Sequence, residues 1–217
     1  MTFSLTRIEG PGFCKPACPL VIVASGQITN SSPQEFVNFL KAVPDISRIR
    51  SAVMLNSPGG NVVGALVLGL VWKEMNIAAY VAQPVSDSSG VSRQLRPGRC
   101  FSACAYALLG ARSRVIPEGS QVGIHRMHVF QAPRDPAEGG FQSPYVFAPN
   151  NHVEVLRRYV ATVGASPRVV DLAEAVGPES IKILTADEMR ALKVSTAAPG
   201  GSKAKARSRP ERQNTSQ

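Results

Sequence analysis

The sequence predicts an α/β fold with parallel strands, and two observations predict it. Short, continuous apolar runs alternate with longer segments of helical spacing, in the order strand, helix, strand, helix, strand. This alternation is typical of buried parallel strands joined by crossover helices. The composition agrees, because 217 residues with 44% hydrophobic and 18% charged residues are typical of one compact globular domain with appendages. We expect the main domain at residues 20–195, after an N-terminal segment at 1–19 with a cysteine pair and before a tail at 196–217.

Apolar runs and the turn signals that end them predict the individual elements. In the first half of the chain we expect strands at 20–24, 52–55 and 78–82, and helices at 36–43 and 62–75. In the second half we expect a helix of small residues at 101–109, strands at 113–116 and 122–125, and helices at 151–163, 167–176 and 186–192. The polar segment 83–98 is expected to be a mobile loop, and the Pro/Gly-rich segment 134–149 shows no periodicity.

The net charge of +9 is concentrated toward the C-terminus, where residues 199–217 carry five basic side chains against one acidic one. This segment has no large apolar residues, so it cannot bury enough surface to offset its ordering entropy, and we expect it to be disordered. A basic segment of this kind is more often simply solvated than a nucleic-acid-binding segment, so we expect no nucleic-acid partner.

The four cysteines form two similarly spaced pairs, Cys14 with Cys18 and Cys100 with Cys104. Sequence alone leaves three disulfide connectivities open, and a four-thiolate zinc site is an alternative. A bond between Cys100 and Cys104 would require Cys100 to precede the helix, because two positions four residues apart on one helix hold their Cβ atoms too far apart.

Three segments carry residues with a possible chemical role. Gly59 and Gly60 follow a buried strand and can leave N–H groups pointing at an anion, although an ordinary turn explains them as well. Ser102 opens a small-residue helix beside the N–H of Ala103, as a nucleophile or as a simple N-cap. His125 ends a short strand, as a general base or as a structural polar group.

Taken in order, the segments VMLNSPGG, FSACAYALLGA and VGIH resemble the Clp protease proteolytic subunit and signal peptide peptidase A group of the crotonase-like superfamily. The resemblance runs from about Leu20 to Val194, and the form C-x-S-A-C-A-Y is most similar to a mostly exported bacterial branch of Clp-protease-like proteins. It implies the crotonase-like (ClpP/crotonase) fold, a spiral of repeated β-β-α units with parallel strands. It also implies Ser102 as nucleophile, His125 as general base, and Gly59 and Ala103 as oxyanion N–H donors, with Gly60 shaping the turn.

The same resemblance places the third catalytic position near Ile181, which is not an acid. Glu179 lies just upstream, while Asp171 and Asp187 are further away. The sequence therefore leaves open a Ser-His dyad, a triad completed by Glu179, and an inactive relative. His128 in place of His125 as the base is a smaller alternative.

We therefore predict a serine peptidase-like hydrolase, an ATP-independent endopeptidase with no cofactor and no metal, acting on a peptide or protein substrate as a homo-oligomer. The main alternative is a catalytically inactive member that binds peptides or a partner. Acyl-CoA chemistry on the same fold is disfavoured, since SPGG followed by the serine helix resembles the peptidase branch.

The compartment stays open between two indications. The cysteine pairs and the exported branch favour a periplasmic or other extracytoplasmic location. No apolar leader is visible at the N-terminus, which favours the cytoplasm unless the true start lies upstream. The sequence leaves membrane association undecided.

Overall fold

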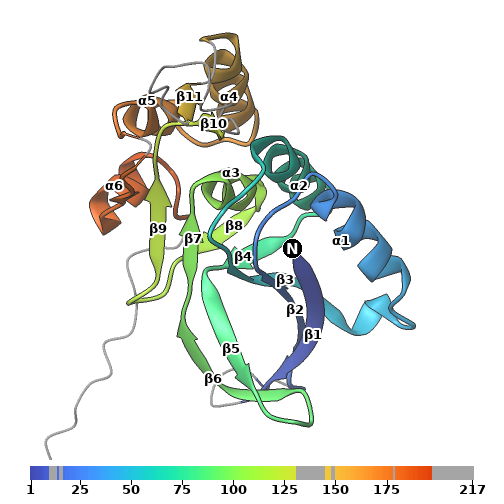
Figure 1. Ribbon diagram of the computed structural model, residues 1–217. Coiled ribbons are helices and arrows are strands. Elements are labelled where there is room, and N and C mark those ends of the chain that lie inside the picture. The colour runs from blue at the N-terminus through green and yellow to red at the C-terminus, as the bar shows by residue number, and fades with distance from the viewer. Residues whose placement is uncertain (10–13, 15–16, 131–144, 148–149, 178, 197–217) are drawn as a thin grey trace, which may run out of the picture.

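The computed structural model describes residues 1–9, 14, 17–130, 145–147, 150–177 and 179–196, and the structural statements below concern these residues. The chain forms a mixed α/β fold in which a seven-stranded sheet and a three-stranded sheet share a core with helices (Figure 1). In Figure 1 the β5–β6 hairpin lies at the bottom of the molecule, and α4 and α5 lie at the top.

The large sheet contains the parallel strands that the apolar runs predict. Its strands β2, β3, β4 and β8 pair in parallel in that order, and β1 pairs antiparallel with β2. In sheet order the strands are β5 (Ala82–Ser86), β6 (Val91–Pro97), β1 (Thr2–Ile8), β2 (Leu20–Ser25), β3 (Ile49–Asn56), β4 (Ala78–Tyr80) and β8 (Ser113–Val115).

The smaller sheet carries the strands that lead into the candidate site. In the order β12 (Lys182–Ile183), β9 (Gln121–Ile124) and β7 (Arg99–Phe101), β9 pairs in parallel with β7 and antiparallel with β12. A bridge between Ser57 and Cys100 joins β7 to the chain that leaves β3. A separate pair is formed by β10 (His128–Phe130) and β11 (Tyr145–Phe147).

Helices of the N-terminal half bury apolar faces against the sheets. They are α1 (Ser32–Lys41), α2 (Val62–Glu74) and α3 (Ala103–Gly110), while the short 3-10 helix η1 (Ile46–Arg48) buries no residue. A side chain at Gly110 would overlap the backbone of Gly69, so α2 and α3 pack backbone to backbone. This close packing requires glycine at position 110, and glycine at position 69 leaves room for the Tyr159 hydroxyl of the later helix at 150–162.

Three helices follow in the described part of the second half: α4 (Asn150–Thr162), α5 (Arg168–Glu174) and α6 (Ala186–Ala191). Leu156, Val160 and Val170 are buried in the common core, so α4 and α5 belong to it. Tyr159 of α4 donates a hydrogen bond from its hydroxyl to the Tyr106 carbonyl of α3, at 2.8 Å. This bond ties the C-terminal helices to the helix that carries the candidate serine.

Two expectations about local structure are wrong. Residues 83–98 are not a loop, because most of them form the β5–β6 hairpin, in which β6 also pairs in parallel with β1. The helix expected at 101–109 begins at Ala103, since Cys100 and Phe101 pair with β9. Residues 197–217 and most of the segment 134–149 lie outside the described residues.

The four cysteines form two local disulfides, Cys14–Cys18 and Cys100–Cys104. The zinc alternative is therefore wrong. Cys100 lies in β7, before the helix that contains Cys104, which is the condition that the sequence set for this bond. Within the described part of the chain, no helix is long and apolar enough to cross a membrane.

Candidate active site

The SPGG turn connects β3 to α2 and brings its glycines against neighbouring backbone. Gly59 and Gly60 have φ values of +101° and +132°, which side chains rarely adopt. A Cβ at Gly60 would overlap the Ile28 carbonyl oxygen, and one at Gly59 would lie 3.1 Å from the Ala103 nitrogen. The two N–H groups expected to bind an oxyanion thus come from segments in direct contact. In this structure the Gly59 N–H donates to Ser57 Oγ at 3.1 Å.

Ser102 occupies a strained turn between β7 and α3. Its φ of +55° and ψ of −126° lie outside the regions that non-glycine residues normally occupy. Such a conformation costs of order 1–3 kcal/mol and persists only where the surroundings enforce it. The Ser102 N–H donates to the Gly123 carbonyl at 2.8 Å, and the Ser102 carbonyl accepts from Ala105 at 2.9 Å.

The hydroxyl of Ser102 does not serve as an ordinary helix cap. Ser102 stands at the N-cap position of α3, but its side chain makes no capping hydrogen bond. A capping serine normally has extended backbone geometry and accepts from an N–H of the first turn. The simple N-cap interpretation is therefore excluded by the geometry.

His125 follows β9 directly, on the strand beside the one that leads to Ser102. In the parallel pairing, Phe101 lies opposite Gly123, so Ser102 and His125 follow the carboxyl ends of two neighbouring strands, at the same end of the small sheet. The His125 Nδ1 lies 2.9 Å from the Arg126 carbonyl oxygen. A carbonyl can only accept, so in this contact Nδ1 is the donor. Both side chains are described, and no direct hydrogen bond joins them in this structure.

His128, the alternative base, belongs to another element. Its backbone lies in β10, opposite Phe147 of β11, outside the small sheet. The structure thus brings His125, rather than His128, to the strand edge beside Ser102.

The position expected for the third catalytic residue is occupied by isoleucine. In the antiparallel pairing of β12 with β9, Lys182 lies opposite Ile124, and Ile181 directly precedes this pairing at the end of β9 that leads to His125. The Ile181 side chain passes over Gly123, since Cγ2 would lie 2.6 Å from a Cβ there. Ile181 is 44% exposed. An apolar side chain therefore covers the strand where an acid was sought.

The acids that were considered lie elsewhere. Asp171 forms an ion pair with Arg157 at 2.8 Å, and Asp187 forms one with Arg190. Glu179 lies in the exposed turn between α5 and β12.

One acid near the site was missed from the sequence. Glu174 lies at the end of α5, and its Oε2 atom is 3.1 Å from Nε of Arg126. The backbone N–H of Arg126 donates to the Val176 carbonyl at 3.1 Å. These contacts hold the residue whose carbonyl meets the His125 ring. Nothing in the local sequence indicates them, because they depend on how α5 packs against the end of β9.

Tyr106, one turn after Ser102 on α3, is nearly buried. Burial, and then the nearby charge of Glu174, raise the pKa of Tyr106 above its ordinary value. The phenol therefore stays neutral through the physiological range. Among the described residues, no group of three or more His, Cys, Asp or Glu side chains is gathered as a metal site.

Comparison with known proteins supports the fold. No family model and no curated protein matches the sequence. Among solved structures, a serine-to-alanine mutant of the 1510-N membrane-bound stomatin-specific protease has a TM-score of 0.55 at 16% identity, covering 80% of this chain and 75% of that chain. A lysine-to-alanine mutant of the same protease, in complex with a substrate peptide, has a TM-score of 0.54 at 17% identity, covering 80% and 71%. A ClpP1 mutant from Listeria monocytogenes has a TM-score of 0.48 at 14% identity, covering 81% and 88%.

The protein therefore has the ClpP/SppA-like, crotonase-type α/β fold. The fold predicted from SPGG, the serine helix and the strand ending in histidine is confirmed. At identities below 20% the likeness concerns the fold, and the residues of the site stand on the geometry of this chain.

Proposed function

We propose that this protein is a serine peptidase-like hydrolase with Ser102 as its nucleophile. The observation that carries the proposal is the conformation of Ser102, a strained residue between a strand and a helix whose hydroxyl is not used for capping. Strained backbone at a reactive position is typical of functional sites, where the surrounding structure holds a side chain in place for chemistry. Structural neighbours include a protease solved with a substrate peptide, so a peptide bond is the substrate class that we propose.

The proposed reaction begins with attack of Ser102 Oγ on an amide carbonyl. His125 Nε2 takes the hydroxyl proton as the Oγ–carbon bond forms, and the carbonyl π electrons move onto oxygen. The N–H groups of Gly59 and Ala103 bind this oxyanion, for which the Gly59 N–H must leave Ser57 Oγ. Collapse expels the amine, which takes the proton from His125, and water releases the acyl group by the same route in reverse.

The catalytic group that we propose is either a Ser-His dyad or a triad in which Glu179 is the third residue. Asp171 and Asp187 are weaker candidates because each already pairs with an arginine. The proposed reaction requires His125 Nε2 to come within hydrogen-bond reach of Ser102 Oγ when substrate binds. Reorientation on substrate binding is common for such pairs in ligand-free sites.

The second candidate function is a catalytically inactive member that binds a peptide or a protein partner. Ile181 favours it, because the position where an acid was expected is apolar and an unoriented histidine is a poorer base. We further propose that the protein acts as a homo-oligomer in an oxidising compartment outside the cytoplasm. The two disulfides support this compartment, since such bonds persist where thiols are not kept reduced.

A fluorophosphonate probe tests the proposal. Ser102 Oγ would bond to phosphorus as fluoride leaves, and the modified peptide would be identified by mass spectrometry. We expect labelling at Ser102 in the parent protein, none in Ser102→Ala, and at least a hundredfold slower labelling in His125→Ala. A parent protein that is folded but inert to the probe and to a peptide library, in every assembled form, would support the binding function instead.

A further inference from the structure

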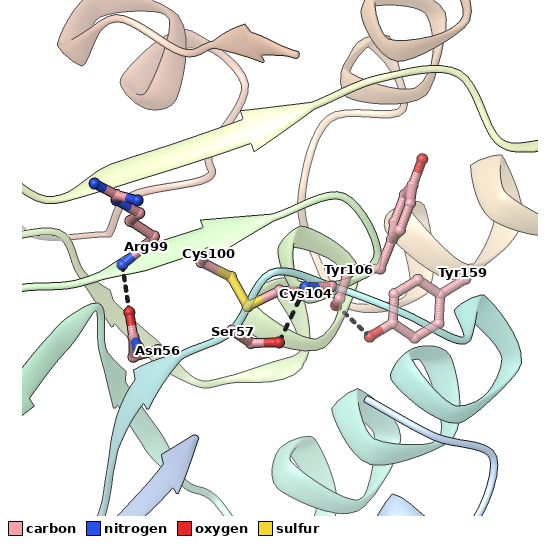
Figure 2. The surroundings of a disulfide bond; sticks show 8 residues. Asn56, Ser57, Arg99, Cys100, Cys104, Tyr106 and Tyr159 are labelled. Atoms are coloured by element: carbon pink, nitrogen blue, oxygen red, sulfur yellow. Dashed lines mark hydrogen bonds between the residues drawn. A yellow bond between two sulfur atoms is a disulfide. The ribbon is translucent and has the colours of Figure 1, made fainter. Parts of the chain in front are cut away.

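The Cys100–Cys104 disulfide spans the turn that contains Ser102. Cys100 lies in β7 and Cys104 in the first turn of α3, with Cα atoms 5.1 Å apart and Ser102 midway between them in the chain. Figure 2 shows the bond running from the strand to the helix, with Ser57 beside it. The covalent ring thus closes around the strand-to-helix turn itself.

The same bond is coupled to the turn that carries Gly59. The Ser57 N–H donates to the Arg99 carbonyl at 2.7 Å, and the Phe101 N–H donates to the Ser57 carbonyl at 3.1 Å, so Cys100 sits between two backbone bonds to Ser57. Ser57 Oγ in turn accepts from the Gly59 N–H, the dashed line beside Ser57 in Figure 2. On the other side, Cys104 directly follows Ala103. The disulfide therefore joins β7, which is hydrogen-bonded to Ser57 of the Gly59 turn, to the helix that begins with Ala103.

The Cys100–Cys104 bond constrains the local backbone strongly and contributes less to the stability of the whole fold. A bond between residues only four apart closes a very short loop, which restricts the unfolded chain less than a long loop would. Both cysteines are fully buried in the main core, which shields the bond from solvent. What the bond does constrain strongly is the backbone between its ends, and that backbone includes the positive φ of Ser102.

We propose that Cys100 and Cys104 are positioning residues of the serine centre: their disulfide holds Ser102 in its strained conformation and keeps the Ala103 N–H in place beside Gly59. This inference rests on the proposed function of Ser102. It assigns no electron transfer to the reaction, since the bond remains oxidised throughout. Without the bond, the turn is free to relax toward the extended geometry of an ordinary N-cap serine.

The second disulfide provides a matched control. Cys14–Cys18 has the same sequence separation but lies in the connection between β1 and β2. The variants Cys100→Ala/Cys104→Ala and Cys14→Ala/Cys18→Ala each remove one bond of equal loop length. For both we would measure the maximal labelling rate by the fluorophosphonate, the concentration at half-maximal rate, the final labelled fraction and the melting temperature.

A positioning role predicts a specific pattern of results. The maximal labelling rate of Cys100→Ala/Cys104→Ala should fall at least tenfold, with a small change in half-saturating concentration and complete final labelling, while the control keeps the parent rate. A purely structural role would instead reduce the labelled fraction in proportion to the unfolded fraction. A parent-like maximal rate in the Cys100→Ala/Cys104→Ala variant would overturn the proposal.

Two further measurements cover the remaining outcomes. If the alanine pair does not fold, Cys100→Val/Cys104→Ala refills the buried volume, and the same rates decide. If the parent protein is inert to the probe, the proposed function fails. A crystal structure of Cys100→Ala/Cys104→Ala then decides whether the disulfide holds the backbone conformation of Ser102. Ser102 should then leave positive φ, whereas an unchanged φ near +55° would overturn the inference.

Discussion

The backbone of Gly59 lies directly against Ser102. A Cβ at position 59 would come within 2.8 Å of the Ser102 Cβ and 2.5 Å of the Phe101 carbonyl oxygen, closer than real Cβ atoms approach. Gly59 therefore meets two requirements at once, a positive φ and the absence of a side chain. The end of β3 and the serine turn form one packed unit, so a change in either should move the other.

Replacing Gly59 with alanine should impair the reaction at Ser102 more than the fold. The new Cβ must displace the Phe101 carbonyl or the serine itself, so we expect at least a tenfold lower labelling rate by a fluorophosphonate. Gly164→Ala is the control, because Gly164 also has a positive φ of +80° but nothing lies within 4 Å of its Cβ position. In both variants the free energy of unfolding should fall by about 1–3 kcal/mol, because alanine at a positive φ strains the backbone. Equal labelling rates in the two variants would contradict the contact.

Replacing Ser102 with glycine should stabilise the protein while abolishing its reaction. Glycine adopts positive φ without strain, and this gain of order 1–3 kcal/mol exceeds the roughly 0.5–1 kcal/mol that its flexibility costs. We expect a higher melting temperature for Ser102→Gly than for Ser102→Ala, which keeps the strain. A glycine variant that melts below the alanine variant would show that the conformation is not strained in solution.

The parallel core and the order of the site segments were predictable, whereas the fine geometry was not. Buried strands such as β2 and β3 are apolar on both faces, so their sequence signal is strong. The β5–β6 hairpin was missed because its residues are mostly polar, and β6 gains its place by pairing with β1. Strand pairing of this kind depends on residues distant in sequence, so a local pattern does not reveal it.

The same distinction applies to the site. Ser102 and His125 could be singled out as candidates because each ends or begins an element, and the pairing of β7 with β9 brings both to the same end of these two strands. The positive φ of Ser102 has no local signature, and two of the residues that contact this turn, Gly59 and Gly123, are distant from it in sequence. The pairing of the cysteines also required the structure, because four cysteines allow three connectivities.

The acid series tests whether Glu179 orients His125. If it does, Glu179→Gln should lower the labelling rate by orders of magnitude, because a serine protease that loses the charge of its orienting carboxylate loses about 10⁴ in turnover rate. Asp171→Asn and Asp187→Asn should change the rate little, since their partners are Arg157 and Arg190. If all three variants react like the parent while His125→Ala does not, the site is a dyad.

Ile181→Asp should accelerate the reaction if the site works without an orienting acid. Residue 181 directly precedes β12, at the end of the β12–β9 pairing that leads toward His125, and its 44% exposure leaves room for a hydrated carboxylate. A carboxylate there would hold the ring and stabilise the imidazolium that forms as the serine is deprotonated. We expect at least a tenfold higher labelling rate at Ser102, read out by mass spectrometry. Ile181→Asn is the control, since asparagine has the shape of aspartate without its charge, and this variant should react like the parent. Equal acceleration by both variants would show that the gain comes from the smaller side chain rather than from the charge. No gain in either variant would show that the orienting group lies elsewhere.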